Sequence, residues 1–275
     1  MNPGRARRVS TTIGGGLTLA FLFVAAIGPL IYPVDPNAQS LVHALAPPGP
    51  DYPLGADQFG RDILARVLHG ARFSAGIAVA IVVLSLATGI ALAGCALWTG
   101  GVVSATLTLV ADAVYALPGM LVVLMVAGVM GGGAITLVLL LWFVKWPEYY
   151  RLSHATGRFV VSSEHVLASR LAGARPLRVF RFQILPTMAP YLLSVGSLSV
   201  GQTVLSIATL GFLGIGIAPP QAEWGAMIND LRGYWQLAPV QLAAPTVAIV
   251  WIVLGLLLLS QGLSERKARL DDAFS

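Results

Sequence analysis

The side chains that could carry out acid–base or metal chemistry are few and lie far apart. The chain has 12 acidic residues, four histidines at positions 43, 69, 154 and 165, and one cysteine, Cys95. The histidines lack the spacing of a metal-binding set, so we expect no metal site and no bound cofactor in this chain. No GxxxxGK[ST] loop, HExxH, CxxC or nucleophile elbow occurs. The sequence therefore indicates neither catalytic residues nor ATP hydrolysis by this chain.

Asp112 is the one acidic residue beside a long apolar stretch. A contact with a solute or an ion would be its functional interpretation. The alternative, which we favour, is that it marks the end of a membrane span over 113–130, because that stretch nearly fills a bilayer unaided. No second acid faces it in an apolar stretch, so a proton relay is poorly supported.

The elements that must position these groups are membrane-spanning helices. Hydrophobic residues make up 56% of the chain and charged residues 11%, where a soluble domain carries about 25% charged residues. In hydrocarbon every backbone amide needs an internal partner, and the strict alternation of a transmembrane barrel is absent. We therefore expect an all-α polytopic membrane protein. Its helices, about six in number, are expected at residues 13–32, 73–98, 113–130, 134–144, 188–217 and 240–263.

The basic residues predict the orientation of these helices. The first apolar stretch is too long for a signal peptide and has no cleavage site, so it is interpreted as an uncleaved span. If both termini and residues 145–186 are cytoplasmic, that side carries a net charge of +8 and the other loops −2. The net charge of the whole chain is +5, but its basic residues lie between apolar runs, which does not indicate nucleic-acid binding.

Residues 162–186 form the most informative cytoplasmic segment. Ser163 is placed to cap a helix with Glu164 in its first turn, and Gly173 to end that helix. Pro176 suits the first turn of a second short helix, and Pro186 begins the return to the membrane. We expect two short helices at an angle, with small residues at the bend that let another backbone approach, and arginines that anchor the segment at lipid headgroups.

Two further segments are predicted on the opposite side of the membrane. Residues 33–72 begin as a loop rich in proline and glycine, and then show helical spacing from about Asp57, which indicates a surface helix leading into the second span. In residues 211–234, Pro219 and Pro220 stiffen a turn. Trp224 offers a flat apolar surface at the membrane boundary, and Glu223 and Asp230 could pair with basic residues of a docking partner. The alternative is that Trp224 is only an interfacial anchor.

These three segments together resemble motifs of one family. Residues 162–186 read SSEHVLASRLAGARPLRVFRFQILP and resemble the EAA loop of importer permeases of the ATP-binding-cassette superfamily. Residues 52–74 (YPLGADQFGRDILARVLHGARFS) and 211–234 (GFLGIGIAPPQAEWGAMINDLRGY) resemble two signatures of the dipeptide, oligopeptide and nickel class. The tail at 260–272 departs from that class.

The resemblance implies a type I importer permease fold and specific roles for these segments. It implies that a set of residues in the EAA loop couples transport to ATP hydrolysis: Glu164, Ala168, Ser169, Gly173, Leu185 and Pro186. Ser169 stands for the second alanine of the pattern, and Gln183 for its usual isoleucine. A second set would dock an extracytoplasmic solute-binding protein: Pro219, Pro220, Glu223, Trp224 and Asp230.

The resemblance also implies the partners and the location of the protein. We expect a bacterial inner-membrane protein with a homologous permease subunit, two cytoplasmic ATP-binding subunits that hold ATP and magnesium, and the solute-binding protein. Residues 1–75 would hold a cytoplasmic stub, the first span and an outer loop. The permease core, with its coupling loop at about 160–186, would occupy 76–263, and a cytoplasmic tail 264–275. The solute would be a short peptide, nickel or a metal chelate.

Two other classes of protein remain as alternatives, both disfavoured. An intramembrane enzyme needs paired catalytic groups in its spans, and only Asp112 lies near one. A passive channel would not need a basic cytoplasmic docking segment as long as 145–186. Co-purification with a cytoplasmic ATPase would separate an importer from both.

Overall fold

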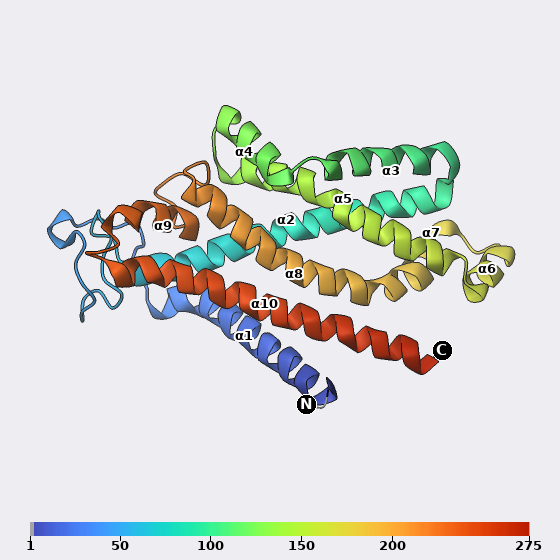
Figure 1. Cartoon of the computed structure of the whole chain (residues 1–275), viewed down its shortest axis with the longest axis horizontal. Helices are drawn as coiled ribbons and strands as arrows, with labels where there is room; N and C mark the ends of the chain where they lie inside the picture. The colour runs from blue at the N-terminus through green and yellow to red at the C-terminus, as the bar shows by residue number, and fades with distance from the viewer. Residues whose placement is uncertain (1–2, 275) are drawn as a thin grey trace.

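Long helices running side by side form the body of the protein in a computed structural model, which describes the backbone of residues 3–274 and the side chains of 11–263 (Figure 1). The long helices are α1 (Pro3–Ile31), α2 (Ile63–Thr99), α5 (Ala134–Val161), α8 (Leu185–Phe212) and α10 (Pro239–Phe274). The shorter ones are α3 (Gly101–Ala116), α4 (Gly119–Met130), α6 (Glu164–Leu171), α7 (Pro176–Val179) and α9 (Trp224–Leu231). Single turns of other helix types lie at Leu41–His43, Phe180–Ile184 and Arg232–Tyr234.

The structure confirms an all-α polytopic membrane protein. Within the part of the chain that the structure describes, four helical segments are long and apolar enough to span a membrane: Thr11–Ile31, Ile63–Thr99, Pro176–Phe212 and Pro239–Leu263. Helices α3 and α4 meet the same criterion only as a pair, bent by 78° at the break between them. Helix α5 is 28 residues long but carries Lys145, Glu148 and Arg151 in its middle. Each of the six predicted stretches is mostly helical, although 113–130 is broken between α3 and α4, and α8 ends at Phe212, before the predicted residue 217. By length and composition four of the six are candidate spans, or five if the bent pair counts as one span.

Small residues bring the central helices close together. On α2, a Cβ atom at Gly89 would lie 2.6 Å from the backbone nitrogen of Tyr150, so α2 and α5 are in close contact at this point. On α1, a Cβ atom at Gly14 would lie 2.4 Å from the backbone nitrogen of Leu259 on α10. Close approach through small residues is the usual basis of helix packing in membranes, where lipid competes with apolar side chains.

The predicted third span begins too late. The chain turns at Gly100 and Gly101 and is already helical from Gly101, so Asp112 lies inside α3 and not before its first residue. Its carboxylate is 3.4 Å from Arg151 of α5, and both side chains are half exposed. The apolar residues 102–111 were left out of the prediction, although nothing in them breaks a helix.

The predicted surface helix before the second span is also wrong. Residues 57–62 form a loop, and α2 runs without a break from Ile63 to Thr99. The carboxylate of Asp62 accepts a hydrogen bond from the backbone N–H of Ala65 at 2.8 Å and so caps the helix. Ile63 and Arg66 are buried, so the first turns of α2 pack inside the protein.

The segment between α5 and α7 is shorter than the loop predicted over 145–186. Helix α5 continues to Val161, and its residues Trp146, Pro147 and Tyr149 are buried. The charged residues in this stretch did not end the helix, because Lys145 contacts α8 and Arg151 pairs with α3. The loop proper is therefore the α6 segment between α5 and α7.

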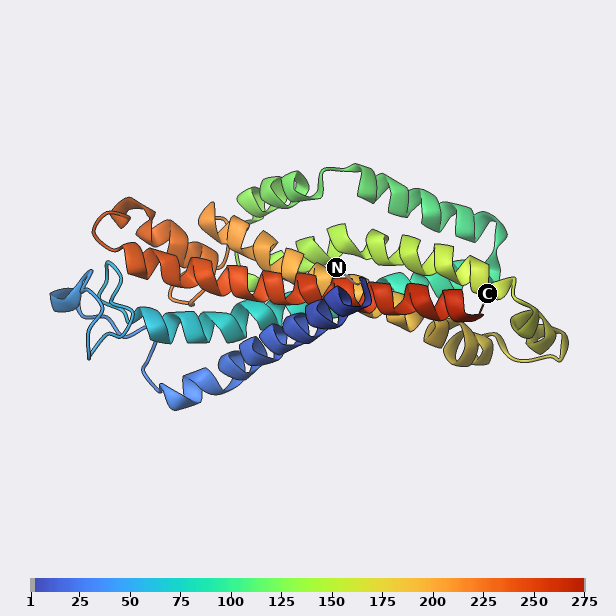
Figure 2. The same cartoon turned by 60° about the horizontal axis from the view of Figure 1, so that its bottom comes forward.

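The two ends of the bundle differ. One end holds the loop 32–62 and α9, and the opposite end holds α6 and α7 (Figure 1). Figure 2 shows α3 and α4 as an arm that lies along α5, away from α1 and α10. The two functional segments predicted from the sequence thus lie at opposite ends of one helical body.

Candidate functional site

Helix α6 lies at one end of the bundle, and one of its side chains, Val166, is buried. Val166 is fully buried in a cluster with Val160, Val179 and Ile184, while Glu164 and Ala168 are exposed. Ser163 precedes the helix as predicted, but its hydroxyl donates to the carbonyl of Val160 at 2.6 Å and does not cap α6. Glu164 still lies in the first turn, where a carboxylate is favoured by the helix dipole.

The turn after α6 has the predicted geometry. Gly173 has φ = +77°, a left-handed conformation that glycine adopts without strain. Pro176 is in the first turn of α7, where its missing N–H costs nothing. Arg170 stacks on the ring of Trp98 at 5.3 Å. This cation–π contact ties α6 to the end of α2.

The second helix of this segment is not short. It passes from α7 through a π turn at Phe180–Ile184 directly into α8. The N–H of Leu185 bonds to the carbonyl of Phe180, five residues earlier. A proline inside a helix removes one hydrogen bond and its ring crowds the carbonyl four residues before it. The wider π turn ahead of Pro186 accommodates that ring, so Pro186 lies within the helix and does not start a new one.

The two departures from the family pattern contact each other. The Gln183 side-chain amide donates to the Ser169 hydroxyl at 2.8 Å, and that hydroxyl donates to the carbonyl of His165 at 2.9 Å. The hydrogen bond joins α6 to the π turn across 14 residues. Leu185 packs against the buried cluster beneath it. The sequence singled out both substituted positions but gave no sign that they form a pair.

Exposed apolar side chains, with arginines between them, cover the end of the bundle that carries α6 and α7. Leu171 is 82% exposed, Leu177 75% and Phe182 67%. Arg175, Arg178 and Arg181 stand between them, and a groove runs along residues 172–175 beside these side chains. Exposed leucine and phenylalanine next to one another indicate a surface that another molecule covers. We call Leu171, Leu177, Phe182 and the three arginines the α6 surface.

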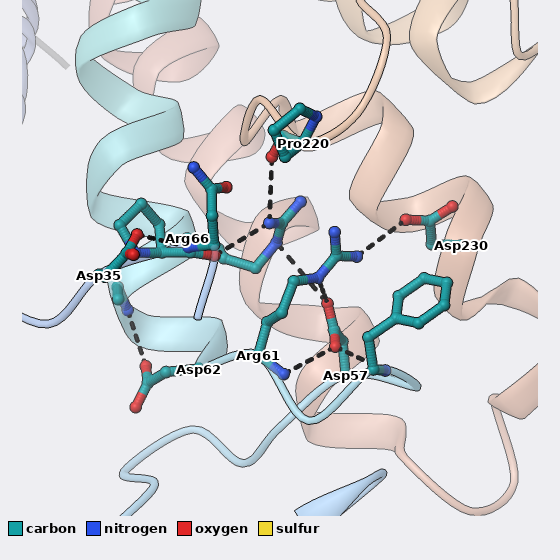
Figure 3. Close-up of polar contacts among 11 residues, drawn as sticks. Asp35, Asp57, Arg61, Asp62, Arg66, Pro220 and Asp230 are labelled. Carbon is teal, nitrogen blue, oxygen red and sulfur yellow. Dashed lines mark hydrogen bonds and ion pairs between the residues drawn. The ribbon is translucent and has the colours of Figure 1, made fainter. Parts of the chain in front are cut away.

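The opposite end is held by a buried ionic cluster (Figure 3). The Asp57 carboxylate pairs with Arg61 and Arg66, and it accepts the backbone N–H of Phe59 and of Arg61 at 2.9 Å each. Arg61 also reaches Asp230 of α9 at 3.4 Å. Removing Asp57 would leave Arg66 without an ion-pair partner and Arg61 with Asp230 alone, and breaking a buried ion pair costs about 3–5 kcal/mol in comparable cases.

The same cluster joins three separate segments of the chain. Arg66 of α2 donates to the carbonyl of Pro36 at 3.1 Å and to that of Pro220 at 3.4 Å. The hydroxyl of Tyr32, just after α1, donates to Asp62 at 2.7 Å. Burial, together with the Asp62 carboxylate, raises the pKa of Tyr32 to about 12. The signature at 52–74 therefore fastens the loop 32–62 to α2 and α9.

Two of the five predicted docking residues are not on the surface. Trp224 is 0% exposed and donates its indole N–H to the carbonyl of Val67 on α2 at 3.2 Å. Glu223 is 1% exposed and accepts the N–H groups of Gly225 and Ala226 at 2.9 and 2.8 Å, which caps α9. Burial raises the pKa of the Glu223 carboxyl, and the two N–H donors counteract part of that rise.

The other three docking residues have different surroundings. Asp230 is partly exposed and is engaged by Arg61, while Pro219 and Pro220 are exposed. Among the side chains that the structure describes, no group of three or more His, Cys, Asp or Glu could hold a metal ion. The geometry of this end is that of a rigid cap on the bundle.

Comparison with known proteins gives one family. The sequence model of the family described as binding-protein-dependent transport system inner membrane component matches residues 85–270 of this chain. The chain is 35% identical to the di/tripeptide transport system permease protein of Pseudomonas aeruginosa strain UCBPP-PA14, over 91% of this chain and 86% of that protein. It is 34% identical to the nickel transport system permease protein of Escherichia coli K12, over 85% of this chain and 84% of that protein.

Proposed function

The chain belongs to the family of binding-protein-dependent transport system inner membrane components, and from this premise we propose that it is the permease subunit of an ATP-driven importer. It pairs with a homologous permease, and the two form a pathway for short peptides or for nickel and other metal chelates. The similarity to one peptide and one nickel permease supports this range of solutes. ATP is bound and hydrolysed by two separate cytoplasmic subunits.

The observation that carries the proposal is the α6 surface. A helix with one buried side chain and an exposed apolar surface beside it is marginal alone, because its apolar face needs a second partner. We infer that the ATP-binding subunit covers this face and that the arginines pair with acidic groups around it. Movement of that subunit would pass through the Ser169–Gln183 hydrogen bond and the π turn into α8. The other residues of the same coupling segment are Glu164, Ala168, Gly173, Leu185 and Pro186.

The end with α9 would receive the solute-binding protein. Pro219 and Pro220 remain candidates for this surface, together with Val42 and Trp235, which are 91% and 59% exposed. Glu223 and Trp224 act from below by fixing α9 in place. In this orientation both termini and α6 are cytoplasmic, in keeping with the excess of basic residues on that side.

Co-purification tests the proposal directly. The variant with Leu171→Glu and Leu177→Glu should lose the ATP-binding subunits from the detergent-solubilised complex, because each change puts a charge into an apolar contact. Leu237→Glu is the matched control: Leu237 is 74% exposed at the opposite end and should leave the ATP-binding subunits bound. Retention of those subunits by the double variant, or uptake of solute without ATP, would contradict the assignment and favour a passive channel.

A further inference from the structure

Lys145 lies at the middle depth of the bundle. It stands about three helical turns along α5 from Ala134, where that helix begins at the end that carries α9. Ser199, which it contacts on α8, is between three and four turns from Phe212, where α8 ends on the same side. Both positions are therefore roughly 16–20 Å inside the helical body, a depth similar to half of a hydrocarbon core about 30 Å thick. The charged end of Lys145 cannot reach an interface by a short extension of the side chain.

The ammonium group of Lys145 has little to compensate its charge. Its one polar contact within the described side chains is the Ser199 hydroxyl at 3.4 Å. Glu148, one turn along α5, is not within ion-pair distance of it in this part of the chain, and Asp112 is taken by Arg151. An ammonium group has three donors. A half-buried cation at membrane depth with one long hydrogen bond is costly unless a further partner is provided.

Helix α8 carries a polar stripe that starts at Ser199, the residue that Lys145 contacts. Gln202, Ser206 and Thr209 follow Ser199 at intervals of three and four residues, so they lie along one side of a largely apolar helix. The hydroxyls of Ser206 and Thr209 donate to carbonyls of their own helix at 2.9 and 2.8 Å. The exposed side-chain amide of Gln202 has no such partner among the described residues. An exposed amide without a partner, ten residues from the end of α8, indicates that Gln202 faces a wet pathway or another subunit.

We propose that Lys145 and Gln202 bind the carboxylate of the solute during its passage. This inference rests on the proposed function and deepens it, because both classes of solute can carry this group: a peptide at its C-terminus, and a metal chelate wherever the chelator is a carboxylate. An ammonium group and an amide N–H are suitable donors for one carboxylate. Ser199 positions the lysine without neutralising it. The contact favours solutes with a free carboxylate over neutral ones of the same size.

Uptake by the full complex in proteoliposomes tests the proposal, with loaded binding protein at saturation. The solutes are a dipeptide and the same dipeptide with a C-terminal amide, and nickel with a carboxylate chelator and nickel with a neutral amine chelator. In Lys145→Gln the uptake ratio of the carboxylate to the neutral solute should fall about tenfold, and Lys145→Arg should keep most of it. Arg151→Gln, which removes a cation from the same helix, is the control and should leave the ratio unchanged.

A binding measurement that omits the binding protein accompanies uptake. In a Cys95→Ala background, millimolar dipeptide or carboxylate chelate should protect Ser206→Cys from a thiol reagent. The neutral analogues should not, and Lys145→Gln should abolish the protection. An effect on the peptide pair alone assigns the carboxylate to the peptide C-terminus, and an effect on the nickel pair alone assigns it to the chelator.

Failure of the proposed function and failure of the carboxylate contact would give different results. A wild-type complex that imports none of the four solutes contradicts the proposed function, and the inference with it. If the wild type imports them but Lys145→Gln leaves both the uptake ratio and the protection unchanged, only the carboxylate contact is overturned. The same holds if Lys145→Gln lowers the uptake of all four solutes equally. Equal loss would mean that Lys145 pairs with the partner permease.

Discussion

At the scale of single residues, Ser169 and Gln183 satisfy each other's polar groups through one hydrogen bond. Ser169→Ala leaves the Gln183 amide, whose oxygen is already without a partner, with no hydrogen bond at all. We expect Ser169→Ala and Gln183→Ile each to lower the free energy of unfolding, by about 1 kcal/mol for one net hydrogen bond. The double variant should recover part of the loss, because two apolar groups replace two polar ones.

Thermal unfolding of the four proteins in detergent gives the double-mutant cycle. A coupling energy of about 0.5 kcal/mol or more between the two positions would agree with the contact. Losses that simply add would show that Ser169 and Gln183 act independently. Ser162→Ala is a suitable control, because its hydroxyl bonds only to the carbonyl of Phe159 in the adjacent turn.

Glu223 gives a pH-dependent prediction. Its pKa in the folded protein is raised by burial, so the folded state binds a proton there more readily than the unfolded state. That contribution to stability is full below the unfolded value of about 4.3 and is lost as pH rises through the raised folded pKa. Glu223→Gln removes this dependence and still offers an oxygen to α9.

The measurement is the difference in melting temperature between wild type and Glu223→Gln. We expect the melting temperature of the wild type to fall relative to that of Glu223→Gln as pH rises from 4.5 to 7.5. A difference that is constant with pH, or one that changes in the opposite direction, would refute a raised pKa.

Single-residue surroundings were the part least open to sequence reasoning. A loop with two prolines, a tryptophan and two acids is typical of a surface, and for Pro219 and Pro220 that was correct. Trp224 can be buried because its indole N–H donates a hydrogen bond to the carbonyl of Val67, 157 residues away. Glu223 is buried because Gly211 leaves room for its carboxylate. Neither contact has a local signal, so their burial follows only from the packing of α9 against α2 and α8.

At the scale of elements, the turn at Gly173 should control coupling. Gly173→Ala places a Cβ atom on a residue with φ = +77°. The resulting strain costs roughly 1 kcal/mol or more. We expect reduced uptake and reduced stimulation of ATP hydrolysis, with unchanged solute affinity of the binding protein. Gly131→Ala is the matched control, since Gly131 has φ = +83° and equally open surroundings in the turn between α4 and α5.

The comparison of the two glycine variants separates backbone strain from a role in coupling. If both reduce uptake equally, the effect is general destabilisation and the coupling role of Gly173 is wrong. If only Gly173→Ala does so, with normal assembly of the complex, the turn after α6 is part of the coupling path.

Helix existence was predictable, and helix limits were less so. Apolar runs of about 20 residues identified α1, α2, α8 and α10, because hydrocarbon leaves the backbone no alternative to a helix. The predicted helix ends were wrong where a helix continues through polar residues. Helix α5 runs on through Lys145 and Arg151, since other helices supply their partners. The end of α6 at Gly173 and the start of α7 at Pro176 were predicted correctly, because these signals are local.

At the scale of the whole molecule, the orientation in the membrane can be measured. In a Cys95→Ala background, Pro50→Cys should react with an impermeant thiol reagent added from outside, and Arg158→Cys only after the membrane is opened. Both positions are exposed, so access depends on the side of the membrane alone. Strong labelling of Arg158→Cys in intact cells would invert the topology and move α6 away from the ATP-binding subunits.

The π turn makes the relation between the two ends depend on chain length as well as on composition. A π turn holds one residue more than an α-helical turn at the same place. Deleting one residue from Phe180–Ile184 would remove that extra residue, so the residues before it would keep nearly the same direction around the axis of α8. A deletion in the regular part of α8 would instead rotate everything before it by about 100°. Leu171 and Leu177 would then face a different direction, although every side chain of the α6 surface was kept. A single-residue deletion in the regular part of α8 should therefore be far less tolerated than most substitutions there.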